Sequence, residues 1–323
     1  MVSLITNICS RGAVILTSNE PIRRGEFGLT FPVRLVSDIR KSQEWYRNVL
    51  QCHDISGYGH ATRGDGGGMG LIVCTAASQD DIRPNAVAQK RTDEPAEAAS
   101  LEYGCDSLVE VAWHNLAYII EEVRSRGGKI TVKPYEYEHE GRLYMKAQIA
   151  DYDGYNIVLS ANRSQTEEPI SQQPEDKFIK TIQVRLVSDL KKSLDWYKTV
   201  LGCDEVNDSG YARRGDPEAV YPVMEVILQQ AASPHDVCPN AQCAKVRDVK
   251  GLWEGPDFPW DTFVHVPWED VLLIVDEVRA KGGTIGTEPF ETSNDGWDFL
   301  DARITDPDGY SIILGGMRRS GEA

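Results

Sequence analysis

The sequence lacks long apolar runs and clusters of basic residues. No apolar stretch approaches the ~18 residues that a membrane-spanning helix needs. Charged residues make up 26% of the 323 residues and hydrophobic ones 41%, which is typical of a soluble globular protein and excludes a mainly disordered chain. Lys and Arg total 34 against 50 for Asp and Glu, so the net charge is −16. Because such a chain repels phosphate backbones unless a local basic patch compensates, we expect neither nucleic acid nor a membrane as partner.

Catalytic and export signatures are also missing. The seven cysteines are odd in number, and Cys238 and Cys243 lack the close pairs of a structural zinc site, so we expect free thiols in a reducing cytoplasm. The N-terminus has no basic segment before its apolar residues, and Arg11 interrupts it, which argues against a cleaved signal. No G-x-S-x-G elbow occurs, and the Gly-rich stretch 64–68 lacks the Lys-Ser/Thr of a phosphate-binding loop.

An internal repeat is the main feature that is present. The segment Val33–Asp38 recurs as Val184–Asp189, and further matches follow in the same order. These are Trp45-Tyr46 with Trp196-Tyr197, Gly127-Gly128 with Gly282-Gly283, and Asp151–Tyr155 with Asp306–Tyr310. The chain therefore consists of two copies of one domain of ~150 residues. We assign an N-terminal extension to 1–27, domain 1 to 28–162, a polar linker to 163–178, domain 2 to 179–317 and a tail to 318–323.

Each copy divides again into two similar halves. In the first half a β-branched strand ends before Asp38, a typical N-cap, and a helix is predicted over 39–50. In the second half a strand over 108–112 precedes a helix over 116–126, which the Gly-Gly pair ends. Three further strands follow in the second half, over 130–132, 144–149 and 156–159. The unit β-α-β-β-β is thus predicted four times, and we call these units modules 1 to 4.

These motifs resemble those of the vicinal oxygen chelate superfamily, which includes glyoxalase, bleomycin resistance protein and extradiol dioxygenase. The spacing Asp38-x3-Ser42-x2-Trp45-Tyr46-x2-Val49-Leu50 resembles its first helix, and Gly57–Asp65 resembles a hairpin of bleomycin-resistance proteins. Arg279–Gly283 and Asp306–Tyr310 are similar to the closing signatures of glyoxalase I. The resemblance covers nearly all of 29–162 and 179–316. It implies an α+β fold in which paired βαβββ modules form two open β-cups with flanking helices, each able to hold a ligand or a divalent metal.

The resemblance also implies His or Glu at set strand positions where members bind their metal. The corresponding residues here are apolar: Phe31, Leu108 and Val158 in domain 1, and Ile182, Phe263 and Ile313 in domain 2. The remaining position falls near Gly70 and Glu225. Since apolar side chains cannot bind a divalent cation, metal-dependent catalysis is disfavoured and we expect no cofactor. Whether the protein is an enzyme stays open. The alternative is one divalent metal near Glu225 and His265 in domain 2.

Other residues allow two interpretations each. Arg34 and Arg185 interrupt apolar strands at equivalent sites, either as an anion clamp in the cup or as buried structural ion pairs. Glu110 and His265 share one strand position that faces the cup interior. Aromatic residues in loop-like surroundings either stack on a planar ligand or fill the core. The candidate ligand-binding residues are Trp253, Trp260, His265, Glu225, Trp297, Phe299, Arg185, Tyr211, Arg34, Glu110 and Tyr58.

Three functions follow as hypotheses. The preferred one is a metal-independent binding protein that sequesters a planar small molecule in an aromatic-lined cup, of the kind that confers bleomycin resistance. The alternative is a metal-dependent lyase, isomerase or dioxygenase with a relocated metal site in domain 2. In the third hypothesis, the protein's own side chains fill the cups, and the protein is a structural or regulatory module that works through its surface. The modules pair either in sequence order or across the linker, and either way one chain mimics a two-fold dimer and can act as a monomer.

Overall fold

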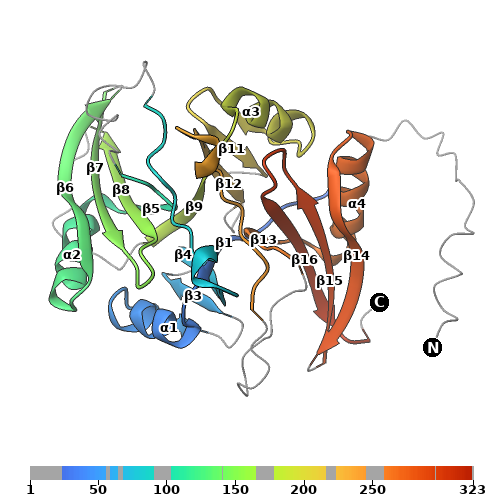
Figure 1. Ribbon diagram of the computed structural model, residues 1–323, viewed down its shortest axis with the longest axis horizontal. Helices are drawn as coiled ribbons and strands as arrows, with labels where there is room; N and C mark the ends of the chain where they lie inside the picture. The colour runs from blue at the N-terminus through green and yellow to red at the C-terminus, as the bar shows by residue number, and fades with distance from the viewer. Residues whose placement is uncertain are drawn as a thin grey trace, which may run out of the picture.

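Four modules of one strand, one helix and three strands form the protein, as the sequence predicts (Figure 1). The computed structural model describes residues 24–55, 59–64, 68–90, 103–139, 141–164, 178–215, 223–244, 258–294 and 296–321. Module 1 comprises β1 (Thr30–Val36), α1 (Ile39–Asn48), β2 (Asp54–Ile55), β3 (His60–Arg63) and β4 (Met69–Thr75). Module 2 comprises β5 (Ser107–Val111), α2 (Trp113–Ser125), β6 (Lys129–His139), β7 (Arg142–Ala150) and β8 (Asn156–Ser164).

The second half of the chain repeats this order. Module 3 comprises β9 (Phe178–Val187), α3 (Leu190–Thr199), β10 (Glu205–Val206), β11 (Tyr211–Arg214) and β12 (Met224–Gln230). Module 4 comprises β13 (Thr262–His265), α4 (Trp268–Ala280), β14 (Thr284–Asn294), β15 (Trp297–Thr305) and β16 (Ser311–Arg319). Two short 3-10 helices, Gln79–Asp81 and Pro234–Asp236, follow β4 and β12. No helix in the described part of the chain combines the length and hydropathy that a membrane crossing requires.

The predicted N-caps and the predicted Gly-Gly end are confirmed, although α1 ends at Asn48 instead of residue 50 and α2 begins at Trp113 instead of residue 116. The Asp38 carboxylate accepts hydrogen bonds from the backbone N–H groups of Arg40 and Lys41 at 3.0 and 3.2 Å, and so caps α1. Asp189 caps α3 in the same way. Gly127 follows the end of α2 with φ of +78°, a conformation that glycine adopts without strain.

The strands join modules that are far apart in sequence. One sheet of eight strands runs β14-β15-β16-β13-β1-β4-β3-β2, and the other runs β10-β11-β12-β9-β5-β8-β7-β6. The first sheet is therefore built by modules 1 and 4, which we call cup A, and the second by modules 2 and 3, which we call cup B. The junctions are antiparallel, with Phe31 opposite Phe263 in cup A and Leu108 opposite Ile182 in cup B. Of the two pairings that the sequence left open, the structure has the one across the linker.

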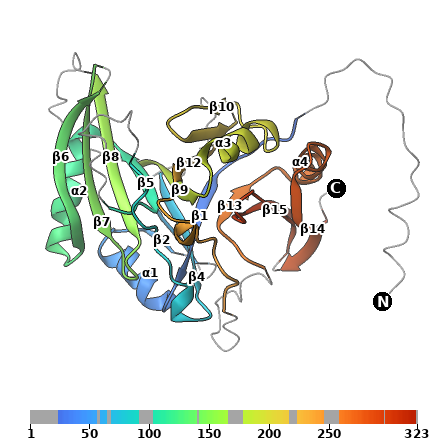
Figure 2. The ribbon, with the colours of Figure 1, turned by 45° about the horizontal axis from the view of Figure 1, so that its top comes forward.

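The helices cover one face of each sheet and bring consecutive modules together. α2 packs against β6, β7 and β8, and α4 packs against β14, β15 and β16. One hydrophobic core joins modules 1 and 2, with Tyr46 of α1 and Leu116 of α2 fully buried in it. A second core joins modules 3 and 4 around Tyr197 and Ile274. Figure 2 shows α1 and α2 together in one part of the molecule and α3 and α4 in the other. Each half of the chain thus shares a core, whereas each cup spans both halves.

The first buried arginine ties two consecutive modules together. Arg34 of β1 is 3% exposed and donates hydrogen bonds to Tyr46 Oη at 2.7 Å, Ser107 Oγ at 2.7 Å and Asp151 Oδ2 at 3.0 Å. Its side chain lies on the helix side of the sheet, because β1 residues of the opposite parity, Phe31 and Leu35, face the cup. All of these acceptors belong to the protein itself.

Arg185 repeats this arrangement in the other half, with Tyr197, Thr262 and Asp306 as partners. The expectation that Arg34 and Arg185 clamp an anion inside a cup is therefore corrected. Their position behind the sheets and their ion pairs favour the structural interpretation that the sequence also allowed.

Strands extend beyond the expected linker and domain limits. β8 continues to Ser164 and β9 begins at Phe178, so residues 165–177 of the linker lie outside the described residues. Ahead of β1, Phe27 is buried beneath the Arg214 guanidinium, which lies 4.3 Å from its ring centroid. Phe178 and Arg63 repeat this contact at 4.6 Å. The end of the expected N-terminal extension therefore packs as part of the repeat.

Candidate functional site

The positions at which the resemblance implies metal ligands converge on the helix-free face of each sheet. In cup A, Phe263 lies between Phe31 and Ile313 on neighbouring strands. A Cβ atom on Gly70, the remaining position in cup A, would lie 2.6 Å from Phe31 Cε1, so the Phe31 ring occupies the space of that missing side chain. In cup B, Leu108 lies between Ile182 and Val158.

These side chains do not fit a catalytic divalent metal. A catalytic zinc site needs about three protein ligands, and Mg²⁺ or Ca²⁺ needs oxygen donors. Of the eight implied positions only Glu225, in cup B, has a donor. The residues that the structure describes contain no group of three or more His, Cys, Asp or Glu side chains that could hold a metal.

Glu225 and His265, the expected seed of a relocated metal site, lie in different cups. Glu225 is on β12 in cup B, and His265 is on β13 in cup A. They were expected to be neighbours because both belong to the second half of the chain. The pairing of modules across the linker separates them, so the structure does not bring this pair together.

Cup A presents a cluster of aromatic rings around His265. The His265 ring meets Phe263 edge to face at 4.9 Å between centroids and Phe31 at 5.7 Å. His60 of β3 meets Phe31 at 5.2 Å between ring centroids. Burial, and secondarily His60, lowers the pKa of His265 to about 4. His265 is therefore a neutral imidazole at pH 7, which stacks on rings and offers one donor and one acceptor.

Other predicted aromatic residues belong to the same cup. Trp260 is 5% exposed and contacts Phe263 at 5.6 Å, as part of the apolar floor. Trp297 and Phe299 lie at alternate positions of β15, and Arg319 lies over the Trp297 ring at 5.1 Å. The candidates Tyr58 and Trp253 lie outside the described residues.

Asp301 of β15 is a candidate that the sequence interpretation missed. Leu300 and Ala302 on either side of it point into the helix-side core, so Asp301 faces the cup. A Cβ atom on Gly315, its neighbour on β16, would lie 3.3 Å from Asp301 Oδ1 and 2.2 Å from Phe263 Cζ. The carboxylate and the Phe263 ring therefore share the space above Gly315. Burial raises the pKa of Asp301 to about 6. The apolar residues alternating with it in β15 were the signal available in the sequence.

Cup B gathers three other candidates around one lysine. Lys180 Nζ lies 2.9 Å from Glu225 Oε1 and 3.7 Å from Glu110 Oε2. Tyr211 Oη donates a hydrogen bond to Glu225 Oε1 at 2.8 Å. Burial raises the pKa of Glu110, and the Lys180 charge opposes that rise. Glu110, Glu225 and Tyr211 thus lie together, and Lys180 already pairs with both carboxylates.

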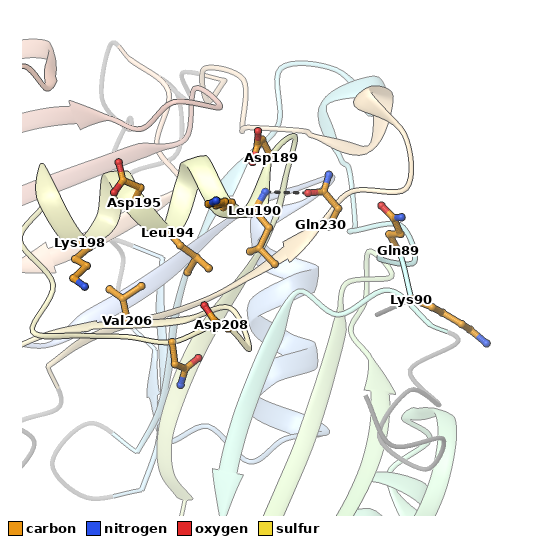
Figure 3. A pocket seen from close by; sticks show the side chains of 12 residues that line it. Gln89, Lys90, Asp189, Leu190, Leu194, Asp195, Lys198, Val206, Asp208 and Gln230 are labelled. Carbon is orange, nitrogen blue, oxygen red and sulfur yellow. Dashed lines mark hydrogen bonds between the residues drawn. The ribbon is translucent and has the colours of Figure 1, made fainter. Parts of the chain in front are cut away.

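A groove of about 830 Å³ lies outside both cups, between α3 and the turn from β10 to β11 (Figure 3). Its base includes Leu190, whose backbone N–H donates to Gln230 Oε1 at 2.9 Å. Its lining includes three Lys and three Asp side chains, so neither charge is in excess there. The lining residues are Gln89, Lys90, Asp189, Leu190, Lys191, Leu194, Asp195, Lys198, Val206, Asn207, Asp208 and Gln230.

Comparison with known proteins agrees with this architecture. Residues 180–314 match the family described as the Glyoxalase/Bleomycin resistance protein/Dioxygenase superfamily. No curated protein matches the chain. A mutant of glyoxalase I from Zea mays is similar in fold, with a TM-score of 0.52 and 17% identity over 90% of this chain and 94% of that one.

A candidate dioxygenase from Bacillus subtilis subsp. subtilis str. 168 is also similar, with a TM-score of 0.53 and 11% identity over 91% of this chain and 86% of that one. At these identities the likeness is one of fold. The first half of the chain repeats the segment that matches the family, and the fold extends over both halves. Residues 180–314 thus match the Glyoxalase/Bleomycin resistance protein/Dioxygenase superfamily, and both halves of the chain share the fold of the similar structures.

Proposed function

We propose that the protein is a metal-independent small-molecule binding protein that holds a planar ligand against the aromatic face of cup A. One observation carries the proposal. Aromatic rings stand at two of the positions at which the resemblance implies metal ligands, and a neutral imidazole contacts both of them. Flat rings provide a large contact area at low entropic cost, and a neutral His265 can stack on a planar ligand.

Cup B supports the proposal by contrast. At the positions equivalent to His265 and Gly70 it has Glu110 and Glu225, which bind Lys180. A planar apolar ligand there would have to displace an ion pair that is already formed, at a cost in desolvation. Of the two cups, cup A is therefore the one suited to a planar ring system.

The test uses the full chain and 2-naphthamide, a neutral planar probe, in isothermal titration calorimetry. We expect binding that weakens about two- to tenfold in Phe263→Ala, because an aromatic contact contributes about 0.5–1.5 kcal/mol. The matched control is Leu108→Ala, the equivalent position in cup B, which should leave the affinity unchanged.

Elemental analysis of the same preparation tests metal independence. Stoichiometric metal whose removal abolishes probe binding would contradict the proposal. Absence of any probe binding would also contradict it, and would favour a cup filled by its own side chains.

A further inference from the structure

Asp301 is an acidic side chain placed among aromatic rings on the cup A face. It lies beside the Phe263 ring above Gly315, and it remains partly exposed on that face. Within the described residues, its carboxylate has no hydrogen bond or ion pair. An unpaired carboxylate in partly apolar surroundings is unfavourable for folding, so its presence calls for a partner from outside the chain.

The charged and titratable groups nearest in the sheet do not supply that partner. Arg303, two residues along the same strand, donates to the Gly286 carbonyl at 2.7 Å and to Thr287 Oγ1 at 3.1 Å. His265 is neutral at pH 7 because of its lowered pKa. Burial is the cause that shifts the pKa of Asp301, with no compensating cation.

We infer that Asp301 selects, for the aromatic face of cup A, planar ligands that carry a cationic nitrogen group such as an amidinium or guanidinium on an aromatic ring. The inference rests on the proposed function and adds the charge of the ligand to it. A carboxylate accepts two parallel N–H bonds from such a group, and charge-assisted bonds are about twice as strong as neutral ones. The partly exposed ring of Phe263 favours the same ligands through cation–π attraction.

Cup B supplies an internal comparison. Lys146 occupies the position of Asp301 there, since each faces its neighbour on the adjoining strand, Ser160 in cup B and Gly315 in cup A. Lys146 Nζ lies 5.2 Å from the centroid of the Tyr137 ring. The two cups therefore have opposite charges at this position, which favours a cationic ligand in cup A.

The experiment compares three naphthalene probes that differ only in charge: 2-naphthamidine, 2-naphthamide and 2-naphthoate. Calorimetry on the full chain at pH 8, where Asp301 is ionised, should give at least tenfold tighter binding of the amidine than of the amide, and the weakest binding of the naphthoate. Asp301→Asn should abolish the preference for the amidine while leaving amide binding within about twofold. Asp301→Glu should retain it, and the matched control Lys146→Met should change none of the three affinities.

The outcomes separate the two proposals. If the amide binds in a Phe263-dependent way but the amidine binds no tighter, or if Asp301→Asn keeps the preference, the role of Asp301 is refuted and the binding function stands. If no probe binds, both fail. Asp301→Asn removes an unpaired charge, so it is expected to fold, which thermal unfolding monitored by circular dichroism will verify.

Discussion

The two cups share one scaffold but have different linings. Behind the sheets, Arg34 with Asp151 in one half matches Arg185 with Asp306 in the other. In front of the sheets the equivalent positions differ in charge, size or polarity. The pairs, cup A first, are His265 and Glu110, Gly70 and Glu225, Asp301 and Lys146, and Gly315 and Ser160. The difference indicates that folding constrains the helix side in both halves alike, whereas the cup side has been free to diverge.

The largest expected effect tests the shared scaffold. Arg185→Met leaves Asp306 buried without its cation, and Arg34→Met does the same to Asp151, so each should lower the free energy of unfolding by about 3–5 kcal/mol. Urea denaturation measures the loss. The control is Arg124→Met, which breaks an exposed pair with Glu121 and should cost less than about 1 kcal/mol. A large loss in one half only would show that the halves do not share this constraint.

The second effect separates the cups by their response to pH. The pKa of His265 is about 4 in the folded chain and 6.5 ordinarily, so the unfolded chain binds this proton first as pH falls. Stability should therefore decline from pH 6.5 to 4, by on the order of 2–3 kcal/mol through this group. In His265→Gln that decline should be absent, whereas the exposed control His114→Gln should keep it.

Asp301 has the opposite sign, because a raised carboxyl pKa favours folding at low pH and that contribution is lost as pH rises from 3.8 to about 6. Asp301 is present in both the parent protein and His265→Gln, so its contribution cancels when their two pH profiles of stability are compared. Equal pH profiles for His265→Gln and the parent protein would refute a buried neutral His265.

The smallest expected effect comes from a variant that places the residue type of Ser160, in cup B, at the equivalent position of cup A, Gly315. In Gly315→Ser the new Cβ atom would lie 2.2 Å from Phe263 Cζ, so the ring must move. We expect a cost of about 1–3 kcal/mol in thermal unfolding and weaker 2-naphthamide binding. The reciprocal Ser160→Gly in cup B should cost about 1 kcal/mol or less and leave probe binding unchanged. Unaltered binding by Gly315→Ser would place the probe elsewhere.

Much of the local structure could be predicted because its signals are local. Asp38 and Asp189 cap their helices through backbone groups two or three residues away, and Gly127 ends α2 by its own conformation. Counting residues from fixed motifs was enough to identify Phe31 and Leu108 as the residues at the implied metal positions. His60 was not among the predicted cup residues, because a strand of four residues has too few positions to show a period of two. Asp301 was missed because a charged residue that alternates with apolar residues in a strand is equally expected on a face exposed to solvent.

The sequence by itself determined that the chain has four βαβββ modules, and that seven of the eight metal positions implied by the resemblance lack a donor side chain. Only the tertiary structure decided which modules form a cup. Within its own module each of β1 and β5 is an edge strand, and an edge with unpaired backbone groups can pair with any strand that reaches it. The choice of partner depends on how the helices pack in each half, a long-range property that no local pattern records. That choice placed His265 beside Phe31 and separated it from Glu225, and so decided which chemistry each cup can offer.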